Sequence, residues 1–172
     1  MNDIVPVKRA LLSVSDKTEL LPILKVLKKY KIKIISSGGT FKEIKKHGFD
    51  CIEISKFTGF SEMLNGRVKT LHPKIHAGIL SNREDKKHRI EMFKAKFPTI
   101  DLVIVNFYPF QKTIMETKNQ KKIIENIDIG GPTMVRSAAK NFKNVTIITD
   151  KNDYQILLTE IKKNNGGTSL KF

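Results

Sequence analysis

Residues 9–40 of the chain read RALLSVSDKTELLPILKVLKKYKIKIISSGGT, and they predict a strand, a helix and a second strand in immediate succession. The apolar run at 9–14 is typical of a buried strand. From residue 19 to 29 the apolar side chains recur with the 3.6-residue period of a helix. A second short apolar run follows at 33–36. Strands joined through a helix lie parallel in one sheet, so this stretch indicates an α/β fold.

The rest of the chain continues the same alternation. Gly38-Gly39 precedes a helix that ends near Gly48, and residues 55–80 predict a long ordered loop with short helical turns. The other patterns predict strands at 51–54, 101–106 and 145–149, helices at 84–97, 119–126, 132–140 and 153–163, and a loop at 164–168. We therefore expect one α/β domain over residues 1–172, a single-domain parallel-sheet sandwich.

Composition excludes several classes of protein. The 172 residues suit one domain, and no apolar run approaches the roughly 20 residues of a membrane span, because Lys interrupts each candidate. The first nine residues lack the apolar stretch of a signal peptide. A single cysteine, Cys51, excludes an internal disulfide and a cysteine-based zinc site. We expect a reducing, cytoplasmic setting and no membrane partner.

The net charge of +15 raises the possibility of nucleic-acid binding. However, 27 of the 32 basic residues are Lys, and the chain is also rich in Ile and Asn, the pattern of an A/T-biased genome. The lysines are scattered along helical segments and do not form an aromatic-interleaved stripe. We expect no specific nucleic-acid partner, and only a general attraction for anionic metabolites.

Two hydroxyl-rich loops could hold a phosphate. Ser37-Gly38-Gly39-Thr40 lies between a strand and a helix, where backbone N–H groups and the helix dipole favour an anion. Ser15-Asp16-Lys17-Thr18 follows the first strand, and both loops should meet at the carboxyl edge of the sheet, where open α/β sheets bind ligands. The alternatives are a plain Gly-Gly turn and a Thr18 that only caps the first helix.

The segment Gly66-Arg67-Val68-Lys69-Thr70-Leu71-His72-Pro73 is denser in polar groups. It supplies a bidentate donor, a point charge and a hydroxyl on irregular backbone, although a solvated basic loop remains the alternative. His72 and His76 are four residues apart, but Pro73 intervenes and no third ligand is evident. We therefore expect no metal.

Two further strings carry groups that could react. Asn106-Phe107-Tyr108-Pro109-Phe110 follows a buried strand; its Phe residues could be core, whereas Tyr108 offers a phenol. Asn126-Ile127-Asp128-Ile129-Gly130-Gly131 places a carboxylate before a helix that also carries Arg136 and Lys140. Asp128 could be a turn residue and Lys140 a helix-end cation, and spacing alone does not make them catalytic.

These strings together resemble one family, the N-terminal IMP cyclohydrolase domain of the bifunctional purine-biosynthesis protein that also carries AICAR transformylase. The matching segments are SVSDKT (13–18), SSGGT (36–40), FTGFSEMLNGRVKTLHPKIHAGIL (57–80), NFYPF (106–110) and ENIDIGGPTMVRSAAKN (125–141). The departures, Ser61 where Pro is common and Phe107 where Leu is common, touch no expected reacting group. The resemblance implies a methylglyoxal-synthase-like fold and a chain truncated near its C-terminus.

The resemblance also implies a reaction: dehydrative ring closure of 5-formamidoimidazole-4-carboxamide ribotide (FAICAR) to inosine monophosphate (IMP), the last step of de novo purine synthesis. No cofactor is implied for this step. 10-Formyltetrahydrofolate would belong to the absent transformylase domain, and the full-length family protein is expected to be a homodimer. Two other readings remain: a methylglyoxal synthase, whose GDQQ-type string is not found here, and a non-catalytic nucleotide-binding regulatory domain, which would not need the RVKT and SAAKN strings together.

The resemblance assigns roles residue by residue. Lys69 and Tyr108 would face the formyl oxygen, Asp128 would hold or deprotonate the carboxamide, and Lys140 would shuttle the proton. The expected substrate-binding residues are Ser15, Asp16, Lys17, Ser37, Gly38, Gly39, Thr40, Arg67, Val68, Thr70, Asn106, Phe107, Ile129 and Gly130.

Overall fold

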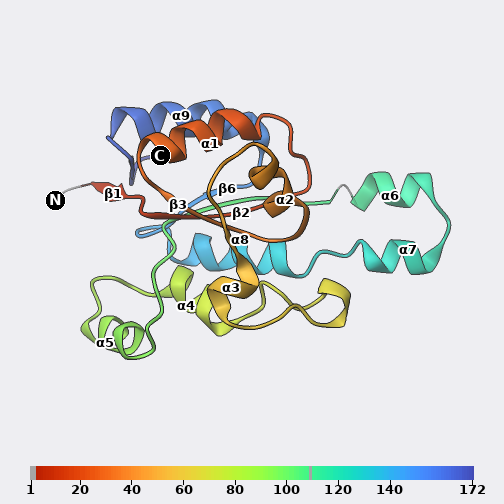
Figure 1. Ribbon diagram of the computed structural model, residues 1–172, viewed down its shortest axis with the longest axis horizontal. Helices are drawn as coiled ribbons and strands as arrows, with labels where there is room; N and C mark the ends of the chain where they lie inside the picture. The colour runs from red at the N-terminus through yellow and green to blue at the C-terminus, as the bar shows by residue number, and fades with distance from the viewer. Residues whose placement is uncertain (1–2, 109) are drawn as a thin grey trace.

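A parallel sheet forms the centre of the molecule in the computed structural model, which describes residues 3–108 and 110–172 (Figure 1). Five strands lie in the order β4-β3-β2-β5-β6, and every neighbouring pair is parallel. The strands are β2 (Arg9–Val14), β3 (Lys33–Ser36), β4 (Ile52–Glu53), β5 (Leu102–Asn106) and β6 (Thr146–Ile148). β2 and β5 are buried along most of their length because helices cover both faces.

Two separate apolar cores lie on the two faces of the sheet. The core on one face joins the sheet to α1 (Leu20–Lys29), α2 (Gly38–Lys46) and α9 (Tyr154–Lys163). The opposite core joins it to α3 (Ile54–Thr58), α4 (Pro73–Leu80) and α8 (Gly130–Lys140). Figure 1 shows α1 and α9 above the sheet and α8, α4 and α3 below it. The expected α/β sandwich is therefore confirmed as three layers.

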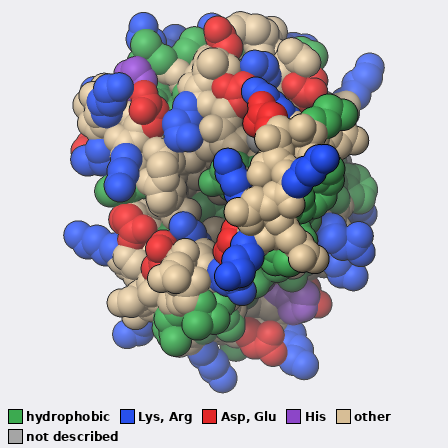
Figure 2. Space-filling view, turned by 90° about the vertical axis from the view of Figure 1, so that its right-hand side faces the viewer, with side chains coloured by type: hydrophobic (Ala, Val, Ile, Leu, Met, Phe, Trp, Pro, Cys, Tyr) green, Lys and Arg blue, Asp and Glu red, His purple; other side chains and the backbone are tan. Residues whose placement is uncertain are grey.

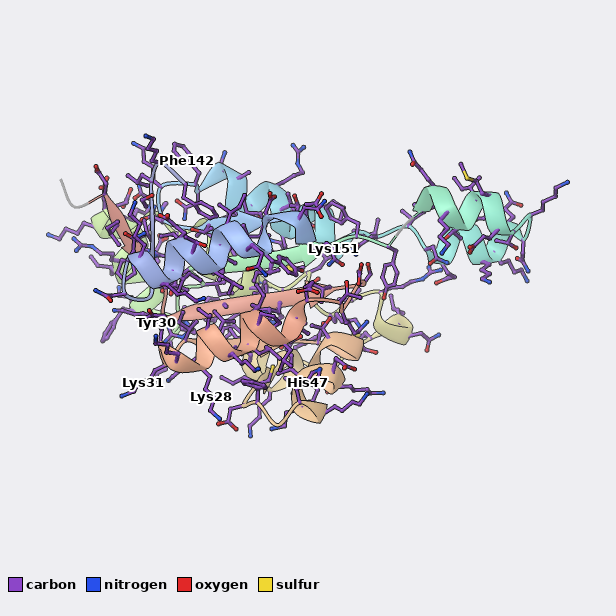
Figure 3. The ribbon with its side chains drawn as sticks, turned by 90° about the horizontal axis from the view of Figure 1, so that it is seen from above. Lys28, Tyr30, Lys31, His47, Phe142 and Lys151 are labelled. Atoms are coloured by element: carbon purple, nitrogen blue, oxygen red, sulfur yellow. The ribbon has the colours of Figure 1, made fainter. Side chains whose placement is uncertain are left out.

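The remaining helices lie outside these layers. α5 (Lys86–Lys94) has no buried residue, and α6 (Phe110–Glu116) and α7 (Gln120–Glu125) form an antiparallel pair that stands away from the sheet (Figures 1 and 3). We call residues 110–125 the α6–α7 arm. Two short 3₁₀ turns occur at Leu64–Gly66 and Lys151–Asp153.

Several expectations need correction. The segment 55–80 is more ordered than a loop, because α4 runs for eight residues and buries Ile75 and Ile79 against the sheet. α8 begins at Gly130, two residues before Pro132, and α6 has no counterpart in the sequence-based expectation. Thr18 does not cap α1: its hydroxyl and N–H bind the Asp16 carboxylate, and α1 begins after Glu19 without a side-chain cap.

The two ends of the described chain pair with each other. β1 (Ile4–Pro6) and β7 (Gly167–Ser169) form a small antiparallel sheet that the sequence did not predict. The expected loop at 164–168 therefore runs partly into a strand. β1, the partner of β7, lies more than 160 residues away in the chain, and neither strand has an alternation of apolar and polar side chains that would predict it.

Charged side chains are spread over the surface. Figure 2 shows Lys and Arg interleaved with acidic side chains over the face at the α6–α7 end, and Lys28 and Lys31 lie at the edge of the molecule beside α1 (Figure 3). Each helix in the described residues is too short or too polar to cross a membrane. The absence of specific nucleic-acid binding stays a prediction.

Candidate ligand-binding and active site

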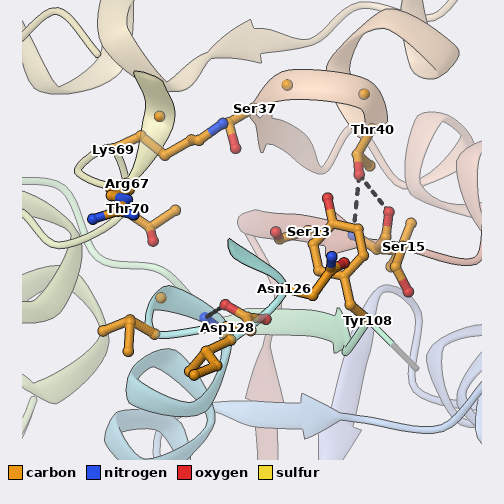
Figure 4. A pocket seen from close by; sticks show the side chains of 18 of the residues that line it. Ser13, Ser15, Ser37, Thr40, Arg67, Lys69, Thr70, Tyr108, Asn126 and Asp128 are labelled. Carbon is orange, nitrogen blue, oxygen red and sulfur yellow. Dashed lines mark hydrogen bonds between the residues drawn. The ribbon is translucent and has the colours of Figure 1, made fainter. Parts of the chain in front are cut away.

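A cavity of about 640 Å³ lies at the carboxyl edge of the sheet, where β2, β3 and β5 end (Figure 4). Ligand sites of open parallel sheets lie at this edge, and the volume is in the range of small-molecule pockets. Most of the residues predicted from the sequence line it: Ser15, Lys17, Ser37, Gly38, Gly39, Thr40, Arg67, Lys69, Thr70, Asn106, Tyr108, Asp128, Ile129 and Gly130. Loops far apart in the chain therefore meet as expected.

The N-terminus of α2 forms the cationic wall of this cavity. Gly38 has a φ of 55°, which favours glycine, and the Lys69 Nζ lies 3.3 Å from where a Cβ on Gly38 would be. The Lys17 Nζ lies 3.6 Å from the corresponding point on Gly39 and donates to the Ser15 carbonyl at 3.0 Å. Two ammonium groups and the free N–H groups of a helix terminus attract an anion to this wall.

The resemblance implies a ribotide ligand such as IMP, and we expect Lys17→Ala to weaken its binding about tenfold or more. A charge-assisted hydrogen bond to a phosphate contributes roughly 1.5–3 kcal/mol, and the backbone donors of α2 remain in the variant. Isothermal calorimetry measures the change, with Lys25→Ala on the exposed side of α1 as the control for total charge. Equal affinity of Lys17→Ala and the wild type would remove Lys17 from the anion site.

Thr40 and Asn106 line the cavity but use their side chains to hold its walls together. The Thr40 hydroxyl accepts from the Val14 N–H at 3.0 Å and donates to the Val14 carbonyl at 2.9 Å. The Asn106 Oδ1 accepts from the Ser15 and Asp16 N–H groups at 2.6 and 3.0 Å. Both side chains thus fix the loop after β2, and their direct contact with a ligand stays a prediction.

The start of α8 forms the wall opposite α2. The Asp128 Oδ1 accepts from the Gly131 N–H at 2.9 Å, which caps the helix, and a Cβ on Gly131 would lie 2.3 Å from the Asp128 Oδ2. A Cβ on Gly130 would lie 2.3 Å from the buried Thr70 hydroxyl. The two glycines therefore let Asp128 and Thr70 approach the backbone of α8.

The two side chains that the resemblance places at the formyl oxygen come from different walls. Tyr108 follows β5 and is 57% exposed, whereas Lys69 points toward Ser37 at the start of α2 (Figure 4). The Lys69 Nζ also forms an ion pair with the Glu62 carboxylate at 3.1 Å. In the free protein, Lys69 therefore lies at the expected phosphate end of the cavity. Pro109, in the same string as Tyr108, lies outside the described residues.

Four predicted site residues lie outside the lining. The Asp16 carboxylate binds Lys151 at 2.8 Å and Thr18, and these bonds hold its pKa well below the usual range. Val68 forms a β-bridge with Met63, and Phe107 offers its carbonyl to the Ser15 hydroxyl.

The fourth residue outside the lining, Lys140, is the last residue of α8 and is exposed. It lies ten residues, or roughly 15 Å of helix rise, from Gly130. This position matches the alternative of a helix-end cation, and the structure does not bring Lys140 to Asp128. Its role as a proton shuttle stays a prediction without geometric support.

Several cavity residues were not among the predicted site residues. They are Ser13, Asn65, Ile124, Glu125, Ile127 and Met134. Glu125 is the most consequential, because its carboxylate pairs with the Arg67 guanidinium. The one available signal was an acidic residue at the start of the ENIDIGG string, which does not by itself indicate a partner 58 residues earlier.

His72 and His76 bond to neighbouring groups of the fold, and Cys51 is a free, half-buried thiol. The His72 Nδ1 accepts from the Lys74 N–H at 3.0 Å, and the His76 Nδ1 lies 3.0 Å from the Ser137 hydroxyl. Burial lowers the pKa of His76 and raises the pKa of the Cys51 thiol to about 12, which keeps that thiol protonated. Within residues 3–108 and 110–172, no group of three or more potential ligands could hold a metal ion.

The sheet and its cavity define the chain as an α/β/α domain with an anion-attracting site at the carboxyl edge. Residues 19–133 match the family described as the MGS-like domain, and the chain belongs to that family. The crystal structure of ForH is similar, with a TM-score of 0.81 and 32% identity over 92% of this chain and 80% of that one.

Longer curated relatives are also similar to the chain. The bifunctional purine biosynthesis protein PurH of Dinoroseobacter shibae is 47% identical over the whole chain, and PurH of Clostridium perfringens is 51% identical over 92% of it. In each case the chain spans 32% of the relative's length. The similarity thus covers this domain and leaves most of the relatives' length without a counterpart here.

Proposed function

We propose that this domain acts in purine biosynthesis as an IMP cyclohydrolase, closing the ring of FAICAR to IMP with loss of water. The purine biosynthesis proteins that match the whole chain support the pathway. One structural observation carries the proposal: the cationic wall at α2 and the polar groups Tyr108 and Asp128 share one cavity. A ribotide has this same division, a phosphate at one end and a reacting heterocycle at the other.

The reaction requires little beyond positioning and charge stabilisation. The carboxamide nitrogen attacks the formyl carbon, the formyl oxygen becomes an alkoxide-like centre, and that oxygen leaves as water after two proton transfers. The attack is intramolecular, so holding the two groups in contact removes much of the entropic barrier. We propose that no cofactor or metal is needed, and that Lys17 and the N–H groups of α2 fix the substrate through its phosphate.

The cavity offers groups for the two proton transfers. Asp128 is fixed by its bond to the Gly131 N–H through one oxygen, which leaves the second for a carboxamide N–H. Tyr108 can donate its phenolic proton to the developing oxyanion, and the Lys69 ammonium is long enough to add positive charge there. These three residues carry the proposed chemistry. The proton-shuttle role of Lys140 is not part of it.

The assay that tests this function follows IMP formation from FAICAR by its absorbance change, using the 172-residue chain as it stands. We expect protein-dependent ring closure above the spontaneous rate. Binding of IMP without turnover would support a regulatory nucleotide-binding domain instead. Release of inorganic phosphate from dihydroxyacetone phosphate would support a methylglyoxal synthase. Dimerisation of the full-length protein stays a separate prediction.

Two substitutions at Asp128 should separate its structural role from its chemical role. We expect Asp128→Ala to lose about 1 kcal/mol of stability because it removes the cap of α8, whereas Asp128→Asn keeps an oxygen acceptor and stays near the wild type. Turnover should fall about tenfold or more in both variants because both lose the ionisable carboxylate. Urea unfolding and the ring-closure assay measure the two effects. Normal turnover in Asp128→Asn would leave the residue only its capping role.

A further inference from the structure

Both cations of the 67–69 segment are already paired with carboxylates in the free protein. The Arg67 guanidinium forms a two-point ion pair with Glu125, in which the Nε lies 3.3 Å from the Glu125 Oε2. The Lys69 Nζ lies 3.1 Å from the Glu62 Oε2. Arg67, Lys69 and Glu125 all line the cavity, so carboxylates hold two cations that a ligand in this cavity would meet.

A carboxylate and a phosphate compete for these groups. The planar fork of an arginine matches the oxygens of either anion, and it cannot bind both in the same two-point geometry. The ion pair with Arg67 lowers the pKa of Glu125, so this carboxylate is ionised at neutral pH. An unpaired carboxylate beside a bound phosphate would repel it. Ligand binding at Arg67 therefore has an electrostatic cost that the sequence does not reveal.

We propose that Glu125 is an internal counterion, which occupies Arg67 in the free protein and is exchanged for the phosphate of the ligand. This inference rests on the proposed function, because it describes how a ribotide gains its contacts in that cavity. This carboxylate thereby favours ligands with a doubly charged phosphate over neutral ones, because only an anion restores the ion pair that Arg67 loses.

Because of the position of Glu125, the exchange of its carboxylate for a phosphate also affects the α6–α7 arm. Glu125 is the last residue of α7, and the α6–α7 arm stands away from the sheet (Figure 1). Its ion pair with Arg67 therefore joins the base of the arm to the loop on the other side of the cavity. When a phosphate takes Arg67, this tie between the arm and the loop is released.

The direction in which one substitution changes the phosphate affinity tests the proposal. We expect Glu125→Gln to bind inorganic phosphate and IMP about three- to tenfold more tightly than the wild type at low salt, because it frees Arg67 and removes a repelling charge. Inosine, which lacks the phosphate, should bind both proteins alike. Glu116→Gln is the matched control, because it removes the same charge from an exposed ion pair with Lys112 on the arm. Calorimetry gives the affinities, and thermal melting verifies folding.

A second variant makes the assignment specific to Arg67. Arg67→Ala should reduce phosphate affinity more in the Glu125→Gln background than in the wild type, where Glu125 holds the guanidinium. Weaker or unchanged phosphate binding in Glu125→Gln would overturn the proposal, since Glu125 would then position Arg67 or be irrelevant to it. An equal gain for inosine, or no phosphate and IMP binding in the wild type, would overturn it too. Failure of the proposed function would appear separately, as absent ring closure in the wild type despite phosphate binding.

Discussion

Lys69→Ala should reduce the turnover of FAICAR about 100-fold or more, the usual scale for losing a donor at a developing oxyanion. The structure places the Lys69 ammonium inside the cavity beside Gly38, on a flexible four-carbon chain that can reach a ligand. We expect the affinity for IMP to fall by less than tenfold, because Lys17 and the N–H groups of α2 remain for the phosphate. Steady-state kinetics and calorimetry measure the two effects.

Arg89→Ala serves as the control for Lys69, because Arg89 is an exposed cation on α5, which does not contribute to the cavity. It should change neither turnover nor affinity. Comparing the loss of turnover with the loss of IMP affinity shows whether the Lys69 ammonium acts at the reacting centre or at the phosphate. A large loss of IMP affinity with normal turnover would assign Lys69 to the phosphate alone, and normal values for both would remove it from the site.

Asp101→Ala should destabilise the domain by about 3–5 kcal/mol, the scale for leaving a buried charge unpaired. Asp101 is 2% exposed and precedes β5. Its Oδ2 accepts from the Lys8 and Arg9 N–H groups at 2.7 and 2.9 Å, and its Oδ1 pairs with the Arg83 guanidinium at 2.8 Å. The substitution leaves two backbone donors and a largely buried guanidinium without their acceptor.

Urea unfolding measures this loss as a shift of the midpoint at an unchanged slope. Asp50→Ala is the matched control, because Asp50 is exposed, and it should stay within about 0.5 kcal/mol of the wild type. Asp101→Asn should fall between the two, since it keeps the size and one acceptor but not the charge. A loss below about 1 kcal/mol in Asp101→Ala would show that Arg83 and the start of β2 find other partners.

Local periodicity was sufficient for the sheet and its principal helices. The apolar runs at 9–14 and 33–36 are strands with those same bounds, and the period of α1 predicts its buried face. The sequence predicts these elements because burial on one or both faces imposes a periodic repeat of apolar side chains. α4 is harder to predict, because only two of its large apolar side chains, Ile75 and Ile79, are buried. These two side chains lie in the core that α4 shares with α8 and the sheet.

The site shows the same difference between what the sequence predicts and what the tertiary structure decides. Residue type and loop position placed Lys17, Gly38 and Asp128 at the carboxyl edge of a parallel sheet, because strand direction alone brings those loops together. Strand direction says nothing about which way a side chain turns or which partner it finds. Thr40 holds β2, Asp16 holds Lys151, and Lys140 lies at the far end of α8.

The pairings of Arg67 with Glu125 and of Lys69 with Glu62 also depend on the folded state. Hydrogen bonds and ion pairs form over about 3 Å, and such distances between residues remote in the chain exist only after the layers have packed. The amino-acid order therefore specifies which groups reach the cavity. Packing specifies which of them are free to meet a ligand.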